Sequence, residues 1–127
     1  MTKKSAEEIA QAWIEKWDCE GIPSSSIDTS DEDLDYEISR DHPQLCLEAI
    51  LYVLTKIPAS PENRHFQVLA AGPLENLIVE SGEQVIDQID VQARKSPEFR
   101  LLLNGSWISD AKPKVLERLK KYLDKPW

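Results

Sequence analysis

Acidic side chains crowd one short segment and are the first residues that could do chemistry. Asp31, Asp33 and Asp35 alternate in the D-x-D-x-D pattern that opens a calcium-binding loop. The pattern then fails, because Tyr36 stands where the loop needs a glycine and His42 where it needs a bidentate glutamate. We therefore interpret the segment as a helix start or a solvated acidic face, which could also bind a protein. Such an interaction surface would comprise Asp31, Glu32, Asp33, Asp35 and Glu37.

The histidines and cysteines show no catalytic or metal-binding spacing. His42 and His65 form neither H-x-x-x-H nor H-E-x-x-H, and Cys19 and Cys46 form no C-x-x-C pair. The sequence also lacks a G-x-S-x-G elbow and a glycine-rich phosphate loop. It therefore predicts no catalytic residue, no metal site and no cofactor, and two reduced thiols.

A glutamate, two arginines and a tryptophan stand among apolar residues in the second half of the chain: Glu75, Arg94, Arg100 and Trp107. Arginine binds carboxylates through paired hydrogen bonds and stacks on aromatic rings, so these side chains could meet. They would then form either an ion-pair cluster that fastens three helices or a small pocket for an acidic group, with His65 as a further candidate. An open cleft would favour the pocket, whereas burial with mutual pairing would favour the structural cluster.

Helices must position these candidates, because apolar residues recur at helical spacing along the chain. Ser5 and Glu8 form a capping box, after which Ile9, Trp13 and Trp17 share one stripe. No convincing strand pattern is present. Further helices are expected at about residues 31–41, 43–57, 61–71, 73–81, 83–95 and 97–104, and from Asp110 or Pro113 to the end of the chain.

Serine, proline and glycine mark where these helices should begin and end. Ser60-Pro61 and Ser96-Pro97 each combine a capping serine with a proline suited to the first helical position. Gly72-Pro73 joins a helix stop to a helix start and is expected to set a corner, and Ser81-Gly82 is expected to end the next helix. Free amides after Pro73 could bind an anion, or Glu75 could occupy them.

Residues 43–57 are the most apolar segment, almost all the way round a helix, which is typical of a central buried helix. Residues 83–95 are amphipathic, with Asp90 and Arg94 spaced as an i, i+4 ion pair at the outside or the rim.

The net charge of −8 is unevenly distributed, because residues 111–127 carry +4 and the other 110 residues carry −12. An acidic body argues against nucleic-acid binding and suits a basic protein partner. The basic residues near the C-terminus are interpreted as a complement to that body. No apolar run approaches the roughly 20 residues of a membrane helix, and no signal peptide is visible, so a cytoplasmic protein without membrane contact is expected.

An unusual string, Leu69-Ala70-Ala71-Gly72-Pro73-Leu74-Glu75, lies in the middle of the chain. After it come Gly82, Ile86, Ile89, Ala93-Arg94, Pro97, Phe99-Arg100, Leu103 and Trp107. Over about residues 66–107 this pattern resembles a family of small bacterial proteins classed as a domain of unknown function. Asn76 departs from it, since an acidic residue is expected there. The resemblance implies a bacterial, cytoplasmic, helical domain and supplies no activity.

These patterns predict an all-α single domain over residues 1–127, with six or seven short helices in an irregular array around the apolar helix at 43–57. The predicted function is a non-enzymatic interaction module that binds a basic partner through an acidic surface, by analogy with immunity or antitoxin-like proteins. The alternative is a small-molecule sensor or small enzyme with a polar pocket near Glu75, Arg94, Arg100 and Trp107.

Overall fold

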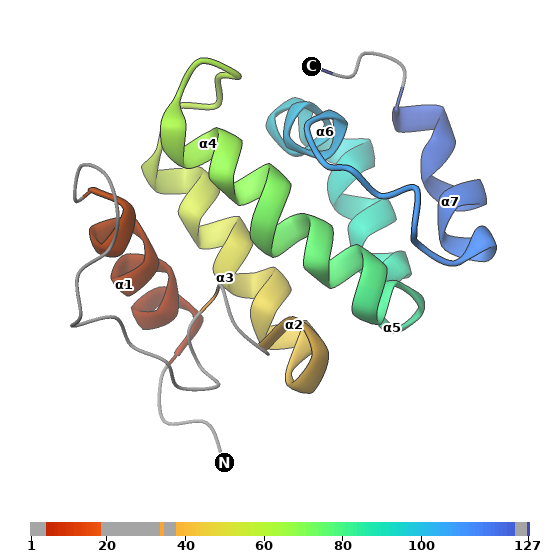
Figure 1. Cartoon of the computed structure of the whole chain (residues 1–127), viewed down its shortest axis with the longest axis horizontal. Coiled ribbons are helices and arrows are strands. Elements are labelled where there is room, and N and C mark those ends of the chain that lie inside the picture. Colours follow the sequence, from red (N-terminus) through yellow and green to blue (C-terminus); the bar gives the residue numbers. More distant parts are fainter. Residues whose placement is uncertain (1–4, 19–33, 35–37, 124–126) are drawn as a thin grey trace.

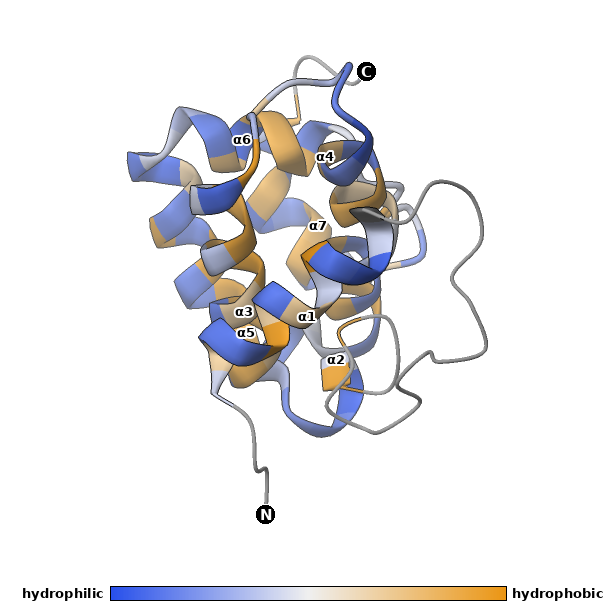
Figure 2. Cartoon of the chain, turned by 90° about the vertical axis from the view of Figure 1, so that its left-hand side faces the viewer, coloured by the Kyte–Doolittle hydropathy of each residue, from blue (hydrophilic) through white to orange (hydrophobic). Residues whose placement is uncertain are grey.

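Helices and turns make up the part of the chain that the structure describes, which is residues 5–18, 34, 38–123 and 127 of a computed structural model (Figure 1). The predicted all-α class is confirmed, since no strand occurs in these residues. Their apolar side chains form one core cluster, and Figure 2 shows hydrophobic and hydrophilic residues alternating along the helices, as expected for helices with one buried face. The α-helices are α1 (Ala6–Asp18), α2 (Ile38–Asp41), α3 (Pro43–Lys56), α4 (Arg64–Leu69), α5 (Glu75–Lys95), α6 (Pro97–Asn104) and α7 (Pro113–Leu119).

The capping box predicted at the start of α1 is confirmed. The Ser5 amide donates to Glu8 Oε1 at 2.9 Å, and the Glu8 amide donates to Ser5 Oγ at 3.2 Å. Reciprocal bonds of this kind satisfy amides that have no partner at a helix start. Ile9 and Trp13 are buried and Trp17 is partly buried, so the predicted stripe packs α1 against α3.

α3 begins at Pro43, directly after α2, as the sequence predicts. It lies against α1, α2 and α5 and buries Cys46, Leu47, Ala49, Ile50 and Val53. One face nevertheless reaches the surface, where Tyr52 is 42% exposed. α3 therefore shares the predicted central position with α5, which contacts α2, α3, α6 and α7.

The corner predicted at Gly72-Pro73 does not form. A π-helical turn, η1 (Ala70–Leu74), joins α4 to α5, and Figure 1 shows one long helix through this region. Pro73 has no N–H, so an α-helix would leave the carbonyl of Leu69 without its donor. A π turn pairs each carbonyl with the amide five residues on, which makes Leu74 the partner instead. The amides after Pro73 therefore lie inside a continuous helix, and the premise of an anion site at a free helix start is removed.

The helix end predicted at Ser81-Gly82 is confirmed, and the chain turns a corner there within α5. Ser81 has φ −135° and ψ 22°, outside the helical region, and the two halves of α5 run in different directions (Figure 1). The Ser81 hydroxyl donates to the Ser39 carbonyl at 2.7 Å, and the Ser39 hydroxyl donates to Glu80 at 2.5 Å. A Cβ on Gly82 would lie 3.0 Å from the Val115 side chain, so glycine allows α7 to approach closely. Contacts from α2 and α7 thus hold this corner on both sides.

The helix start predicted at Pro61 is wrong, because α4 begins at Arg64. Asn63 is its cap, and its side chain accepts from the Phe66 amide at 3.0 Å. Ser60 lies in the turn before it, where its carbonyl accepts from the Asn63 amide at 3.0 Å. Asn63, an equally favoured capping residue three positions later, has replaced the serine that the sequence favoured.

The predicted bounds of α6 are confirmed. The Ser96 hydroxyl accepts from the Phe99 amide at 3.1 Å, and the helix ends at Gly105. Trp127 returns to this helix, where its indole N–H donates to the Leu101 carbonyl at 2.7 Å. A Cβ on Gly105 would lie 2.2 Å from the Trp127 ring, so the ring packs where only glycine leaves room.

The last helix starts at Pro113, one of the two starts that the sequence allowed. Val115 and Leu119 are buried on its inner face. It then tightens into a 3₁₀ turn, η2 (Lys120–Tyr122), which places Tyr122 next to α5.

Candidate functional site

Glu75 and Trp107 meet where the loop after α6 crosses the π turn. The Trp107 amide donates to Glu75 Oε1 at 2.9 Å, and the Ser106 hydroxyl donates to the Ala70 carbonyl at 2.7 Å. We name these four residues the π-turn clasp. The unusual string around Gly72 and the distant tryptophan are therefore one structural unit in space, at a kind of helix irregularity that often marks functional sites.

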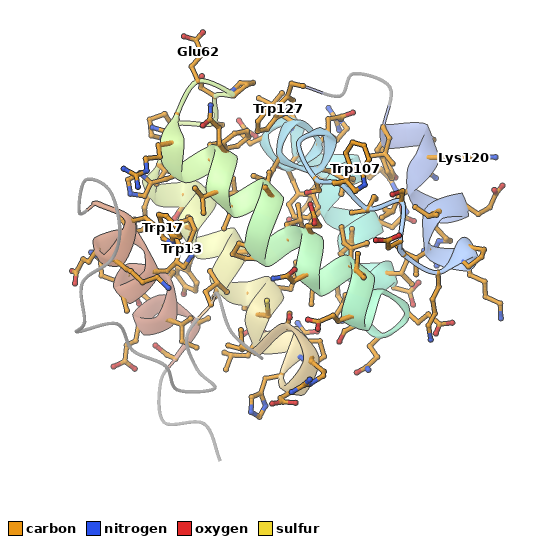
Figure 3. All side chains as sticks on the ribbon, in the orientation of Figure 1. Trp13, Trp17, Glu62, Trp107, Lys120 and Trp127 are labelled. Atoms are coloured by element: carbon orange, nitrogen blue, oxygen red, sulfur yellow. The ribbon has the colours of Figure 1, made fainter. Side chains whose placement is uncertain are left out.

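The side chain of Trp107 lies outside the clasp, 74% exposed. Figure 3 places it near α6 and α7, away from Trp13 and Trp17, which lie together at α1. In the described part of the chain the cation–π contacts are made by Trp17 and Tyr122, and the expected stack of an arginine on Trp107 is not among them.

Arg100 binds main-chain oxygens rather than a carboxylate. Its Nη1 donates to the carbonyl of Ala93 at 2.7 Å and to that of Arg94 at 3.2 Å. These carbonyls belong to the last turn of α5, where no further helical amide follows to satisfy them all. Arg100 is therefore a side-chain cap that also suits the negative end of the helix dipole.

The four predicted residues therefore do not meet at one place. Glu75 binds Trp107, Arg100 binds the end of α5, and Arg94 binds Asp90, with its Nη2 at 3.2 Å from Oδ2. Among the described residues no ion pair joins Glu75 to either arginine. The corner at Ser81 explains the separation, because Glu75 precedes it and both arginines follow it.

Asp90 is a polar centre for which the sequence predicted only one partner, Arg94. Its side chain is 9% exposed, and Tyr122 Oη donates to Oδ1 at 2.5 Å. Arg118 Nη2 donates to Oδ2 at 3.1 Å, Arg94 binds the same oxygen, and Lys121 Nζ lies 4.0 Å from Oδ1. We name these five residues the Asp90 cluster. The predicted Asp90–Arg94 pair is confirmed, but the aspartate is buried beneath α7 and η2 instead of lying at the rim.

The Asp90 cluster lowers the pKa of its carboxyl group from 3.8 to about 2. The hydrogen bond from Tyr122 contributes most and that from Arg118 comes next, and both outweigh the opposing effect of burial. Asp90 is therefore ionised at neutral pH and ties α7 and η2 to α5. A sequence signal did exist, because Asp90 falls within the helical stripe of Ile86, Ile89 and Ala93, where a charged residue is unexpected.

The two histidines and the Cys46 thiol are each placed by the helices around them. His65 Nε2 lies 3.3 Å from the Ile14 carbonyl, and its ring meets Trp13 edge-on at 6.2 Å between centroids. His42 precedes α3 and makes no side-chain cap bond. Burial, followed by the nearby charge of Glu80, raises the pKa of the Cys46 thiol to about 12, which removes its thiolate at neutral pH.

The predicted interaction surface, Asp31, Glu32, Asp33, Asp35 and Glu37, lies outside the described residues, as does Cys19. Leu34, between these residues, and Ile38, directly after them, are described, and both are buried in the core. Among the residues that the structure describes, no group of three His, Cys, Asp or Glu side chains could hold a metal ion. The helices in this part of the chain are also too short or too polar to cross a membrane.

Comparison with known proteins identifies a family. No curated protein and no solved structure matches the chain. One family model matches residues 24–127, a range that includes the acidic residues from Asp28 to Asp41, the π-turn clasp and the Asp90 cluster. Because that match spans most of its length, the chain belongs to a family of unknown function, DUF6869.

Proposed function

We propose that the protein is a non-enzymatic interaction module of the bacterial cytoplasm, and that it binds a basic protein through Asp31, Glu32, Asp33, Asp35 and Glu37. These residues lie within residues 18–41, which we name the acidic segment. The distribution of charge carries this proposal. The acidic segment contains nine Asp or Glu residues and one arginine, a net charge of −8 that equals the charge of the whole chain. The other 103 residues carry 14 acidic and 14 basic side chains.

Ion pairs within the fold support this view of the charge. Basic residues near the C-terminus bind acidic residues of α5 and α7. These pairs include Lys112–Glu83 at 2.7 Å, Arg118–Asp87 at 2.9 Å and Lys120–Glu117 at 3.1 Å. The positive charge of these basic residues is thus partly neutralised inside the fold. The acidic segment carries the remaining negative charge, and a basic partner would meet its field.

The contacts of the polar candidates favour binding over catalysis. Arg100 is committed to main-chain carbonyls, Arg94 to Asp90, and Glu75 to the Trp107 amide. A catalytic site needs acid, base or nucleophile within reach of one reacting atom, and these side chains do not converge. The likeness to immunity or antitoxin-like proteins rests on size and charge.

A pulldown with matched charge variants tests the proposal. The wild-type protein, immobilised by a tag, is exposed to a bacterial lysate at low and at high salt. We expect capture of a basic protein that is released as salt rises, because exposed charges are screened over about 10 Å at 0.1 M salt. The variant D31N/E32Q/D33N/D35N/E37Q should lose that capture.

A control variant removes the same number of charges elsewhere. E7Q/E15Q/E48Q/E62Q/E98Q alters five exposed residues outside the acidic segment and should capture the same protein. Equal loss of capture in both variants would show that capture depends on the net charge of the protein and not on the acidic segment. Absence of a salt-sensitive basic partner under every condition would contradict the proposal.

A further inference from the structure

Trp107 presents a large aromatic ring to solvent. The residue is 74% exposed, although tryptophan is highly buried on average in folded proteins. Among the described residues its side chain has no hydrogen bond, ring contact or cation–π contact. Tryptophan is enriched among the residues that contribute most to binding at protein interfaces, so an exposed ring of this kind indicates a binding surface.

The π-turn clasp holds the main chain beneath the ring. Glu75 Oε1 accepts from the Trp107 amide at 2.9 Å, and the Ser106 hydroxyl donates to the Ala70 carbonyl at 2.7 Å. On the other side of Trp107, Ile108 is buried in the core. The main chain is therefore fixed before and after the ring, which reduces the conformational entropy that the ring would lose on binding a partner.

The charged groups next to the ring are acidic. Glu75 uses Oε1 for the Trp107 amide, and its Oε2 has no partner among the described residues. Asp110, in the same loop as Trp107, is exposed and forms no ion pair in the described part of the chain. The nearest cation along the chain, Lys112, is bound to Glu83 at 2.7 Å. The ring therefore lies beside negative charge that the fold leaves uncompensated.

We propose that Trp107 and Glu75 bind an arginine side chain of a basic protein, at a place that we name the arginine site. Arginine can use both groups at once, because its planar guanidinium stacks on an aromatic face while its N–H groups donate to a carboxylate. The nearby arginines of the chain itself are engaged elsewhere, Arg94 with Asp90 and Arg100 with main-chain carbonyls. This inference goes beyond the proposed function, since it concerns another surface and does not depend on the acidic segment.

The ring and the carboxylate are close enough for one guanidinium group. Glu75 Oε1 lies 2.9 Å from the Trp107 amide nitrogen, and the ring is joined to that nitrogen through the Cα and Cβ atoms of the same residue. A guanidinium group interacts with a ring from within about 6 Å of its centroid and with a carboxylate at about 2.7–2.9 Å. An arginine that approaches along this edge of the ring can therefore stack on it and donate to Glu75 Oε2.

The chemistry of the site favours arginine over related side chains. The ammonium group of lysine is a compact, strongly hydrated charge that cannot stack flat on the ring or donate to both carboxylate oxygens in one plane. Citrulline has nearly the shape of arginine but no charge, so it loses both the cation–π attraction and the charge-assisted hydrogen bonds. The expected order of affinity is therefore arginine, then lysine, then citrulline.

NMR titration of the full ¹⁵N-labelled chain with short peptides tests the proposal. The probes are acetyl-Gly-Arg-Gly-amide and its lysine and citrulline analogues. The chain contains four tryptophans, and Trp107→Phe identifies the indole N–H signal of Trp107. We expect the arginine peptide to shift this signal with a dissociation constant on the order of 1–10 mM, and the citrulline peptide to bind about tenfold more weakly. The Trp127 indole signal should stay in place, because its N–H is bound to the Leu101 carbonyl.

Two matched variants test the role of the carboxylate. Glu75→Gln should raise the dissociation constant about tenfold, because it removes the charge and keeps an acceptor for the Trp107 amide. Glu62→Gln makes the same change at an exposed residue in the turn before α4, which Figure 3 places away from Trp107. It should leave the dissociation constant within about twofold of wild type.

Trp107→Leu tests the role of the ring and is followed through the main-chain amide signal of the same position. We expect it to weaken binding of the arginine peptide at least about tenfold, because leucine offers no aromatic face. The amide spectrum of each variant checks that the fold is retained. A Trp107 signal that no peptide shifts, equal affinity for the arginine and citrulline peptides, or equal weakening by Glu75→Gln and Glu62→Gln would each overturn the proposal.

Discussion

Two carboxylates of α5 hold the C-terminal third of the molecule, and their surroundings differ sharply. Asp90 is nearly buried and is bound by Tyr122, Arg118 and Arg94. Glu75 is partly exposed and accepts one bond, from the Trp107 amide. The chemical group is the same in both. Its contribution to stability therefore depends on how much water it has lost and how many partners replace that water.

The sequence directed attention to the weaker of the two. Glu75 stands in an unusual string, whereas Asp90 resembles an ordinary i, i+4 partner of Arg94. Tyr122 and Arg118 lie 32 and 28 positions from Asp90 along the chain, so only the packing of α7 on α5 reveals the cluster.

Replacing Asp90 should produce the largest effect in this comparison. We expect Asp90→Asn to lower the free energy of unfolding by about 2 kcal/mol, because the bonds that lower its pKa favour the charged form. Urea unfolding measures this. Asp87→Asn is the control, since Asp87 binds the same Arg118 while its side chain is 86% exposed, and it should cost at most about 0.5 kcal/mol. Equal losses of unfolding free energy in the two variants would show that the buried and the exposed ion pair stabilise the fold alike.

Acid should reproduce part of that loss in the wild-type protein. The folded-state pKa of Asp90 is about 2, below its ordinary 3.8, so its contribution is complete above the higher value and disappears as pH falls through the lower one. The stability difference between wild type and Asp90→Asn should therefore shrink from about 2 kcal/mol at neutral pH toward zero near pH 2. Urea titrations across this range test it, and a constant difference would contradict the assignment.

The π-turn clasp should respond less. We expect Glu75→Ala to lower the free energy of unfolding by about 1 kcal/mol, because one hydrogen bond is lost while the Trp107 amide can donate to water instead. Glu75→Gln keeps an acceptor oxygen and should retain most of the stability. Thermal melting compares the two, and a cost for Glu75→Ala as large as that for Asp90→Asn would show that burial is not the deciding factor.

Trp107→Ala should have the smallest effect, within about 0.5 kcal/mol, since the ring is 74% exposed and the clasp uses only its main chain. Trp13→Ala, which removes a buried ring, should cost about 3–5 kcal/mol in the same melting experiment. A large loss for Trp107→Ala would mean that the side chain supports the clasp after all.

Local signals were predictable where a few neighbouring residues decide the outcome. The Ser5–Glu8 box and the Ser96 cap form as expected, because each needs only its own turn of helix. Ser60 begins the same Ser-Pro-Glu triplet as Ser96 and fails to cap, because Asn63 offers a competing cap. The acidic surface predicted at Asp31 to Glu37 remains a prediction.

Helical periodicity, capping residues and the absence of strand patterns were enough to establish an all-α chain and the inward faces of most helices. Only the tertiary structure decided which helix break becomes a corner. Gly72-Pro73 is absorbed by a π turn, while Ser81-Gly82 bends because Ser39 and Val115 hold it. Burial of Asp90 was decided in the same way. These outcomes depend on residues far apart in the chain, whose contacts exist only after the helices have packed.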